Sequence, residues 1–169
     1  MLATGRAASK SEPKRRPVCE GTPALEPGTS FLSGCAPKPA SAAEDLLRQK
    51  LAKRLQFEPG LNAVRLRQPF FEHLEAWPDI VLSDLRVAIE YDSTGRDGLE
   101  HVGRREHSDR RKDRLLRQVG WEVIRVRTGK LRELGPYDVH GGVNRKLVEA
   151  ILEQLRAIRG DLIVNCYLR

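Results

Sequence analysis

Three carboxylates adjoin two short apolar stretches of the chain. Asp79 precedes the first stretch, residues 80–82, and Glu90 and Asp92 follow the second, residues 87–89. Side chains two positions apart on a strand lie on the same face, so Glu90 and Asp92 point the same way. A single acid at a strand end is usually a surface residue or the partner of an arginine. A charged acid next to a buried strand costs free energy unless another group compensates its charge. The combination of three such acids therefore favours a functional site.

The register of the two strands decides whether the carboxylates meet. With Ser83-Asp84 as the hairpin turn, Asp79 pairs near Ala88 or Ile89, and Glu90 lies one or two positions further along. The carboxylates then converge at one end of a small sheet. Carboxylate oxygens in such a group favour a hard divalent cation, Mg²⁺ or Mn²⁺. That cation lowers the pKa of an attacking water and neutralises charge that grows on a phosphate.

The elements that must hold these acids follow from the spacing of apolar residues. Ser41 and Glu44 have the spacing of a capping box, and Leu47, Leu51 and Leu55 then recur at helical intervals. The further predicted elements are a strand from residue 64, strands at 80–82 and 87–89, a helix at 104–119, a strand at 121–127, a helix at 143–158 and an apolar edge strand at 161–168. This order predicts one α/β domain over residues 41–169, with a mixed central sheet flanked by helices.

The composition excludes several classes of protein. The 169 residues are 40% hydrophobic and 5% aromatic, which suits one domain with an aliphatic core. No apolar run is long enough to span a membrane, and the first residues lack the apolar stretch of a secretory signal. Three cysteines without a CxxC spacing argue against a disulfide scaffold and against a cysteine zinc site. We therefore expect a small cytoplasmic protein without membrane contacts.

Residues 1–40 differ from the rest of the chain. They contain six of the ten prolines and almost no apolar periodicity. A stretch of this kind cannot bury enough surface to offset the entropy of ordering. We therefore expect a disordered tail rich in proline, alanine and glycine.

Positive charge concentrates next to the acidic residues. The chain carries a formal net charge of +7, and residues 104–117 hold seven basic and three acidic side chains. Some of these charges support the helix through i,i+4 pairs. The surplus suits the phosphates of duplex DNA, which arginines position through backbone contacts. The predicted DNA-binding residues are Arg65, Arg67, Arg104, Arg105, Arg110, Arg111 and Arg125.

Residues 77–82, 87–92 and 109–126 together resemble the PD-(D/E)xK nuclease superfamily. Within it the chain is most similar to the group of very-short-patch-repair endonucleases, and the resemblance covers about residues 41–130. The resemblance implies a restriction-endonuclease-like core. It also implies a metal-dependent endonuclease that hydrolyses DNA phosphodiester bonds by water attack.

The resemblance also assigns roles to individual residues. Asp79 would be the central metal ligand and Glu90 the second, with the backbone carbonyl of Tyr91 as a third. Glu44 would complete the site through water. The capping box explains Glu44 equally well, and the same residue can serve both roles.

The chain departs from the superfamily's pattern at Asp92, where most members have a lysine. That lysine orients the water or stabilises the transition-state charge. Lys112 on the following helix could supply a relocated ammonium, and His101 or His107 a proton acceptor. A lysine among arginines on a helix is more commonly just solvated.

Taken together, these patterns predict an endonuclease that requires Mg²⁺, or Mn²⁺ in its place, with Asp79, Glu90, Asp92 and Lys112 as catalytic residues. Its partner would be duplex DNA, and it would act alone, as a homodimer or within a larger nuclease complex. The rival class is a nucleic-acid-binding module that kept the nuclease fold and lost the chemistry. A scaffold for protein partners is the third class.

Overall fold

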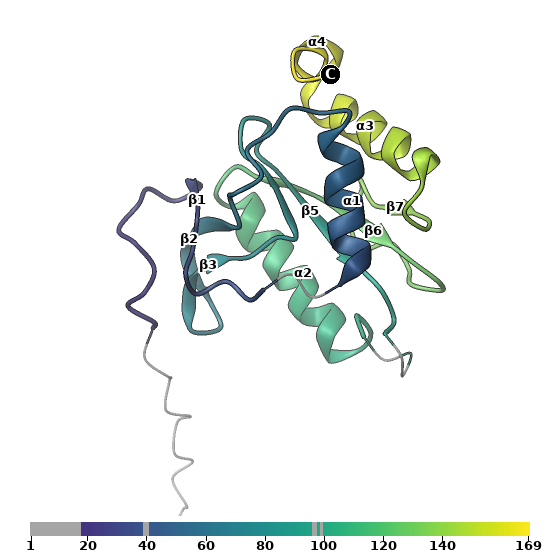
Figure 1. The fold of residues 1–169 in the computed structure, drawn as a ribbon. Helices are drawn as coiled ribbons and strands as arrows, with labels where there is room; N and C mark the ends of the chain where they lie inside the picture. The colour runs from purple at the N-terminus through teal and green to yellow at the C-terminus, as the bar shows by residue number, and fades with distance from the viewer. Residues whose placement is uncertain (1–17, 39–40, 96–97, 99) are drawn as a thin grey trace, which may run out of the picture.

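The computed structural model describes residues 18–38, 41–95, 98 and 100–169. Within these residues the chain forms two sheets and four helices (Figure 1). The smaller sheet contains β1 (Ser30–Phe31), β2 (Ala63–Phe70) and β3 (His73–Ala76). The larger sheet contains β4 (Ile80–Leu82), β5 (Val87–Asp92), β6 (Glu122–Arg127) and β7 (Val139–His140). The helices are α1 (Ala42–Ala52), α2 (Arg104–Arg117), α3 (Arg145–Arg159) and α4 (Asp161–Asn165), and none of them is long and apolar enough to cross a bilayer.

The larger sheet is mixed, which confirms the prediction of an α/β fold with a mixed sheet. β4 and β5 form an antiparallel hairpin, and α2 then crosses over to β6, which pairs with β5 in parallel. β7 extends the sheet beyond β6 in parallel. Ile80 pairs with Ile89, which differs from the predicted register by one or two residues. The next step of the ladder sets Asp79 opposite Glu90.

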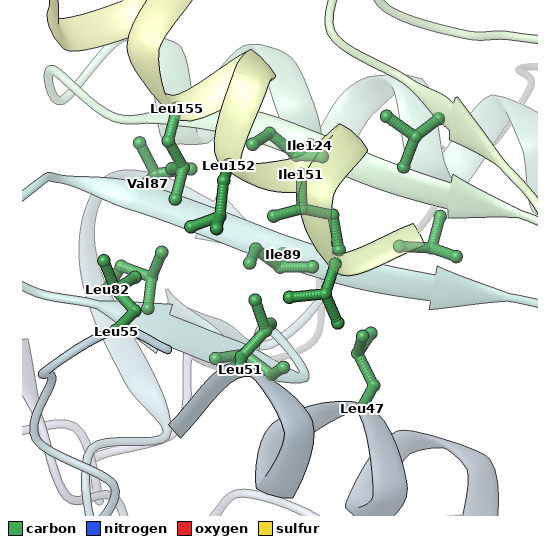
Figure 2. Close-up of a cluster of buried hydrophobic side chains, with 14 of the residues drawn as sticks. Leu47, Leu51, Leu55, Leu82, Val87, Ile89, Ile124, Ile151, Leu152 and Leu155 are labelled. Carbon is green, nitrogen blue, oxygen red and sulfur yellow. The ribbon is translucent and has the colours of Figure 1, made fainter. Parts of the chain in front are cut away.

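One face of the larger sheet packs against α1 and α3 (Figure 2). Leu47 and Leu51 approach the strands from α1, as their spacing predicts, and Ile151 and Leu155 approach from α3. Leu55, predicted on the same helix, joins this core from the segment after α1, because the helix ends at Ala52. The predicted cap is also present, because the Ser41 hydroxyl accepts a hydrogen bond from the backbone N–H of Glu44 at 3.1 Å. This core fixes α1 beside the start of β4 and thereby positions the residues of its first turns.

The other face packs against α2 and the smaller sheet. Leu116 of α2 and Val119, which follows the end of this helix, pack with Val64 and Leu66 of β2. Val123 of β6 belongs to the same cluster. Side chains alternate between the two faces of β5 and β6. The polar residues of these strands that lie on the same face as this second core are therefore covered by α2. Any site built from these residues therefore depends on how α2 docks.

The structure corrects two expectations from the sequence. Residues 18–38, expected as part of a disordered tail, contain β1, which pairs with β2. Trp121 Nε1–H also donates to the Gly28 carbonyl at 2.8 Å, which anchors the segment to the core. Residues 1–17 and 39–40 of the expected tail lie outside the described residues. The segment expected as an edge strand forms α4 instead, with only Leu168 bridged to Leu55. Strands β3 and β7 were not predicted.

Candidate active site

Asp79 and Glu90 lie opposite each other where β4 begins and β5 nears its end. Their neighbours Val81 and Ala88 belong to the core beneath α2, and the alternation of side chains puts both carboxylates on that face. The Asp79 carboxylate accepts a hydrogen bond from the backbone N–H of Tyr91 at 2.6 Å, which fixes its orientation. The hairpin thus brings together the two residues predicted as the principal metal ligands and holds the Tyr91 backbone beside them.

Lys112 of α2 reaches the same place. Its Nζ lies 2.6 Å from Glu90 Oε1, and it donates a hydrogen bond to the Trp77 carbonyl at 2.7 Å. The Lys112 side chain is only 14% exposed, so it is not a solvated helix residue. An ammonium group from α2 therefore stands beside the carboxylates, although position 92 lacks a lysine.

Burial shifts the pKa values of both carboxylates upward, although the Lys112 ammonium stands beside them. Burial raises the pKa of Glu90 to about 8 with the help of the Asp79 carboxylate, while Lys112 acts in the opposite direction. Burial also raises the pKa of Asp79, and the charges of Glu44 and Asp92 add to this effect. Because each acid is desolvated and repelled by the others, a further cation at this point would stabilise their ionised forms.

Glu44 and Arg48 approach Asp79 from α1. Arg48 donates a hydrogen bond to the Asp79 backbone carbonyl, and the Glu44 carboxylate is close enough to raise the pKa of Asp79. A cavity of about 250 Å³ opens here, lined among others by Glu44, Arg48, Trp77, Pro78 and Asp79. Sequence reasoning missed Arg48, although it lies one helical turn after Glu44 and so shares its face.

Asp92 is engaged by two arginines. Its side chain is 1% exposed and forms ion pairs with Arg125 at 2.9 Å and with Arg127 at 2.6 Å. Two buried guanidinium groups need a carboxylate partner, and Asp92 supplies it. In this structure Asp92 links β5 to β6 through ion pairs, and its predicted catalytic role stays a prediction.

The predicted DNA contact of Arg125 is corrected, because this residue is buried. Arg125 is 1% exposed, and it binds Asp113 of α2 at 2.7 Å in addition to Asp92. Arg127 is equally buried. The alternation that put both arginines on one face was predicted, but α2 covers this face, so neither guanidinium group reaches the protein surface.

His101 extends the buried network toward α2. Its Nδ1 lies 2.9 Å from Asp109 Oδ2 and 3.2 Å from Asp92 Oδ1, and one ligand atom from each of these three residues lies within 4.8 Å of the others. The hydrogen bond to Asp109 raises the pKa of His101. His101 is thus tied to two acids, whereas His107 is exposed on the helix.

The remaining predicted DNA-binding arginines fall into two groups. Arg65 and Arg111 are half-buried and donate to backbone carbonyls, and Arg111 also stacks over Phe70 with 5.7 Å between its guanidinium carbon and the ring centroid. These two residues stabilise the β2–β3 hairpin and its packing against α2. The exposed group consists of Arg67, Arg104, Arg105 and Arg110.

No family model, curated protein or solved structure matches this chain. The interpretation of the site therefore rests on its geometry and electrostatics.

Proposed function

We propose that this protein is a metal-dependent endonuclease with a restriction-endonuclease-like core, which hydrolyses phosphodiester bonds of duplex DNA by water attack. The observation that carries the proposal is the 2.6 Å contact between Lys112 Nζ and Glu90 Oε1 beside the Asp79 carboxylate. Two acids at adjoining strand ends and one ammonium from α2, next to a cavity, form the set of groups that such hydrolysis needs.

The side chains present fit a divalent cation. Asp79, Glu90 and Glu44 offer oxygen ligands only, which suits Mg²⁺ and Mn²⁺. Burial raises the pKa values of Asp79 and Glu90, and a bound cation would stabilise their ionised forms. Asp79 and Glu90 would hold the cation, with Glu44 interacting through water. Such a cation lowers the pKa of a bound water and offsets charge on the phosphate.

The chain's own residues supply the rest of the chemistry. The Lys112 ammonium is held by Glu90 and by the Trp77 carbonyl, so it is preorganised to stabilise negative charge on a scissile phosphate or to orient a water. Arg48 fixes the backbone of Asp79. The exposed arginines Arg67, Arg104, Arg105 and Arg110 would bind the DNA backbone.

One observation favours the alternative of a binding module without catalysis. Lys112 already pairs with Glu90, and Asp92 is engaged by two arginines, so much of the polar network is internally compensated. A protein that had lost its chemistry would also keep these contacts for stability. The two functions differ in their response to Mg²⁺.

Incubation of the purified protein with supercoiled plasmid in Mg²⁺, in Mn²⁺ and in EDTA tests the proposal. We expect nicked or linear plasmid with either cation and none in EDTA. A shift of the DNA in a native gel without cleavage, on plasmid and on mismatched duplexes alike, would establish the binding module instead. Cleavage of RNA alone would contradict the assignment of DNA as substrate.

A further inference from the structure

Cys19, Cys35 and His73 come together at a second place, although they are far apart in the sequence. One ligand atom from each lies within 4.8 Å of the others, and all three side chains are half-buried. The two cysteines belong to the segment that precedes α1, and His73 begins β3. This cluster is separate from the candidate active site, and nothing in the proposed nuclease chemistry uses it.

The backbone around the two thiols is arranged closely. The backbone N–H of Cys19 donates to the Glu72 carbonyl at 2.6 Å, which fixes this cysteine beside the start of β3. The N–H of Gly21 points to Cys19 Sγ at 3.4 Å. A Cβ at Gly21 would come within 2.8 Å of Cys35 Sγ and 3.4 Å of Cys19 Sγ, so the absence of a side chain there leaves room for both sulfur atoms.

Two buried polar atoms at this place lack partners among the described residues. His73 Nδ1 is buried without a hydrogen bond. Glu75, two positions further along β3 and therefore on the same face, is 1% exposed. Its Oε1 accepts from Trp77 and from Ser33, but its Oε2 is buried without a partner. A buried carboxylate that forms no ion pair with another described residue is costly.

Ser33 links Glu75 to the segment that holds Cys35. The Ser33 hydroxyl donates a hydrogen bond to Glu75 Oε1 and accepts one from the backbone N–H of Cys35 at 3.0 Å. The group therefore consists of two thiols, an imidazole nitrogen and a carboxylate, with no described cation among them. A cation would satisfy the orphaned atoms and offset the negative charge at once.

We propose that Cys19, Cys35 and His73 bind a structural Zn²⁺ ion and that Glu75 completes the four ligands. Thiolate and imidazole ligands select Zn²⁺ over the hard cations that suit the carboxylate site, and structural zinc is four-coordinate. Each thiol gives its proton to solvent when the metal binds. The N–H of Gly21 then stabilises the Cys19 thiolate, as groups around metal ligands commonly do.

This zinc site would join the N-terminal segment to the wall of the active-site cavity. Ala36, Pro37 and Lys38 follow Cys35 directly and line the cavity that contains Asp79. Trp77, which donates to Glu75, lines the same cavity. Zinc would therefore hold one wall of the cavity in place without taking part in hydrolysis.

Metal analysis of the purified full-length protein, without DNA, tests this proposal independently of the nuclease assignment. After reconstitution under reducing conditions and removal of loosely bound metal, we expect one zinc ion per chain. With Co²⁺ in its place we expect the intense absorption of a tetrahedral site with thiolate ligands. Cys19→Ser and Cys35→Ser should each lose the metal, whereas the exposed Cys166 serves as the control, and Cys166→Ser should retain it.

Glu75→Gln tests the fourth ligand, and we expect it to weaken zinc affinity by about 10- to 100-fold. Unchanged affinity would remove Glu75 from the ligand set. Circular dichroism shows whether each variant folds. A folded wild-type protein that binds no zinc or cobalt would overturn the proposal. So would a Cys19–Cys35 disulfide detected by mass spectrometry under the same reducing conditions.

Discussion

Lys112 Nζ lies 2.6 Å from Glu90 Oε1, across the interface between α2 and the end of β5. The contact exists because α2 crosses back over the face of the sheet on which Glu90 lies. Asp109, Lys112 and Asp113 share one face of this helix by their spacing, and each meets a charged group on or beside the sheet. The docking of α2 thus builds the candidate active site and the ion-pair network next to it.

We expect Lys112→Met to lower single-turnover DNA cleavage by roughly 100- to 1000-fold, because it removes one preorganised charge from the site. DNA affinity should change little, since Lys112 is only 14% exposed. Lys146→Met, an exposed lysine on α3, is the matched control and should cleave at the wild-type rate. Equal rates for both variants would show that Lys112 only stabilises Glu90.

Arg125→Met should lower the free energy of unfolding by about 3–5 kcal/mol. The substitution removes a buried positive charge that pairs with the carboxylates of Asp92 and Asp113. Urea denaturation measures the change. Arg67→Met, at an exposed position of β2, should change it by less than about 0.5 kcal/mol. A small effect of Arg125→Met together with a marked loss of DNA affinity would restore the original prediction that Arg125 binds DNA.

The stability of the metal-free protein should fall as the pH rises from about 4.5 to about 8. Glu90 has a pKa of about 8 in the folded protein, whereas its ordinary value, which applies to the unfolded chain, is 4.5. Between these two pH values the folded state keeps a proton on Glu90 that the unfolded state releases. Unfolding is then favoured by rising pH. Glu90→Gln cannot titrate and should flatten this dependence when urea denaturation is followed in EDTA. A wild-type curve as flat as that of the variant would contradict the raised pKa.

The double variant Arg104→Ala/Arg105→Ala should weaken binding to all DNA sequences alike and reduce the salt dependence of binding by about one unit of slope per lost phosphate contact. Both arginines are exposed at the start of α2. Fluorescence anisotropy over a series of salt concentrations measures the slope. An unchanged slope would place the DNA interface elsewhere on the protein.

The sequence was sufficient for most of the fold because local patterns determine it. The capped helix at Ser41, the hairpin around Ser83 and the crossover helix each have signals within a few residues. β1 could not be predicted, since two residues carry no periodicity and their strand forms only by pairing with β2. The same holds for α4, where an apolar segment of five residues is compatible with either a helix or a strand.

The site was partly predictable for a related reason. Asp79 and Glu90 adjoin strands of a hairpin, so their meeting follows from local register. The partners of Asp92 could not be foreseen, because Arg125 and Arg127 become buried only when α2 covers them. Likewise, the cysteines gave no motif, since Cys19, Cys35 and His73 are brought together only by the packing of the N-terminal segment against β3.

Cleavage of plasmid DNA by Asp79→Asn and Asp84→Asn, assayed side by side in Mg²⁺, tests the central proposal most directly. Both substitutions remove one acid from the same hairpin, but Asp84 is exposed in its turn, whereas Asp79 faces Glu90. We predict that Asp84→Asn cleaves as the wild type does and that Asp79→Asn loses about a thousandfold or more in rate while it still binds DNA. Equal cleavage by the two variants would contradict the assignment of this site as the centre of hydrolysis.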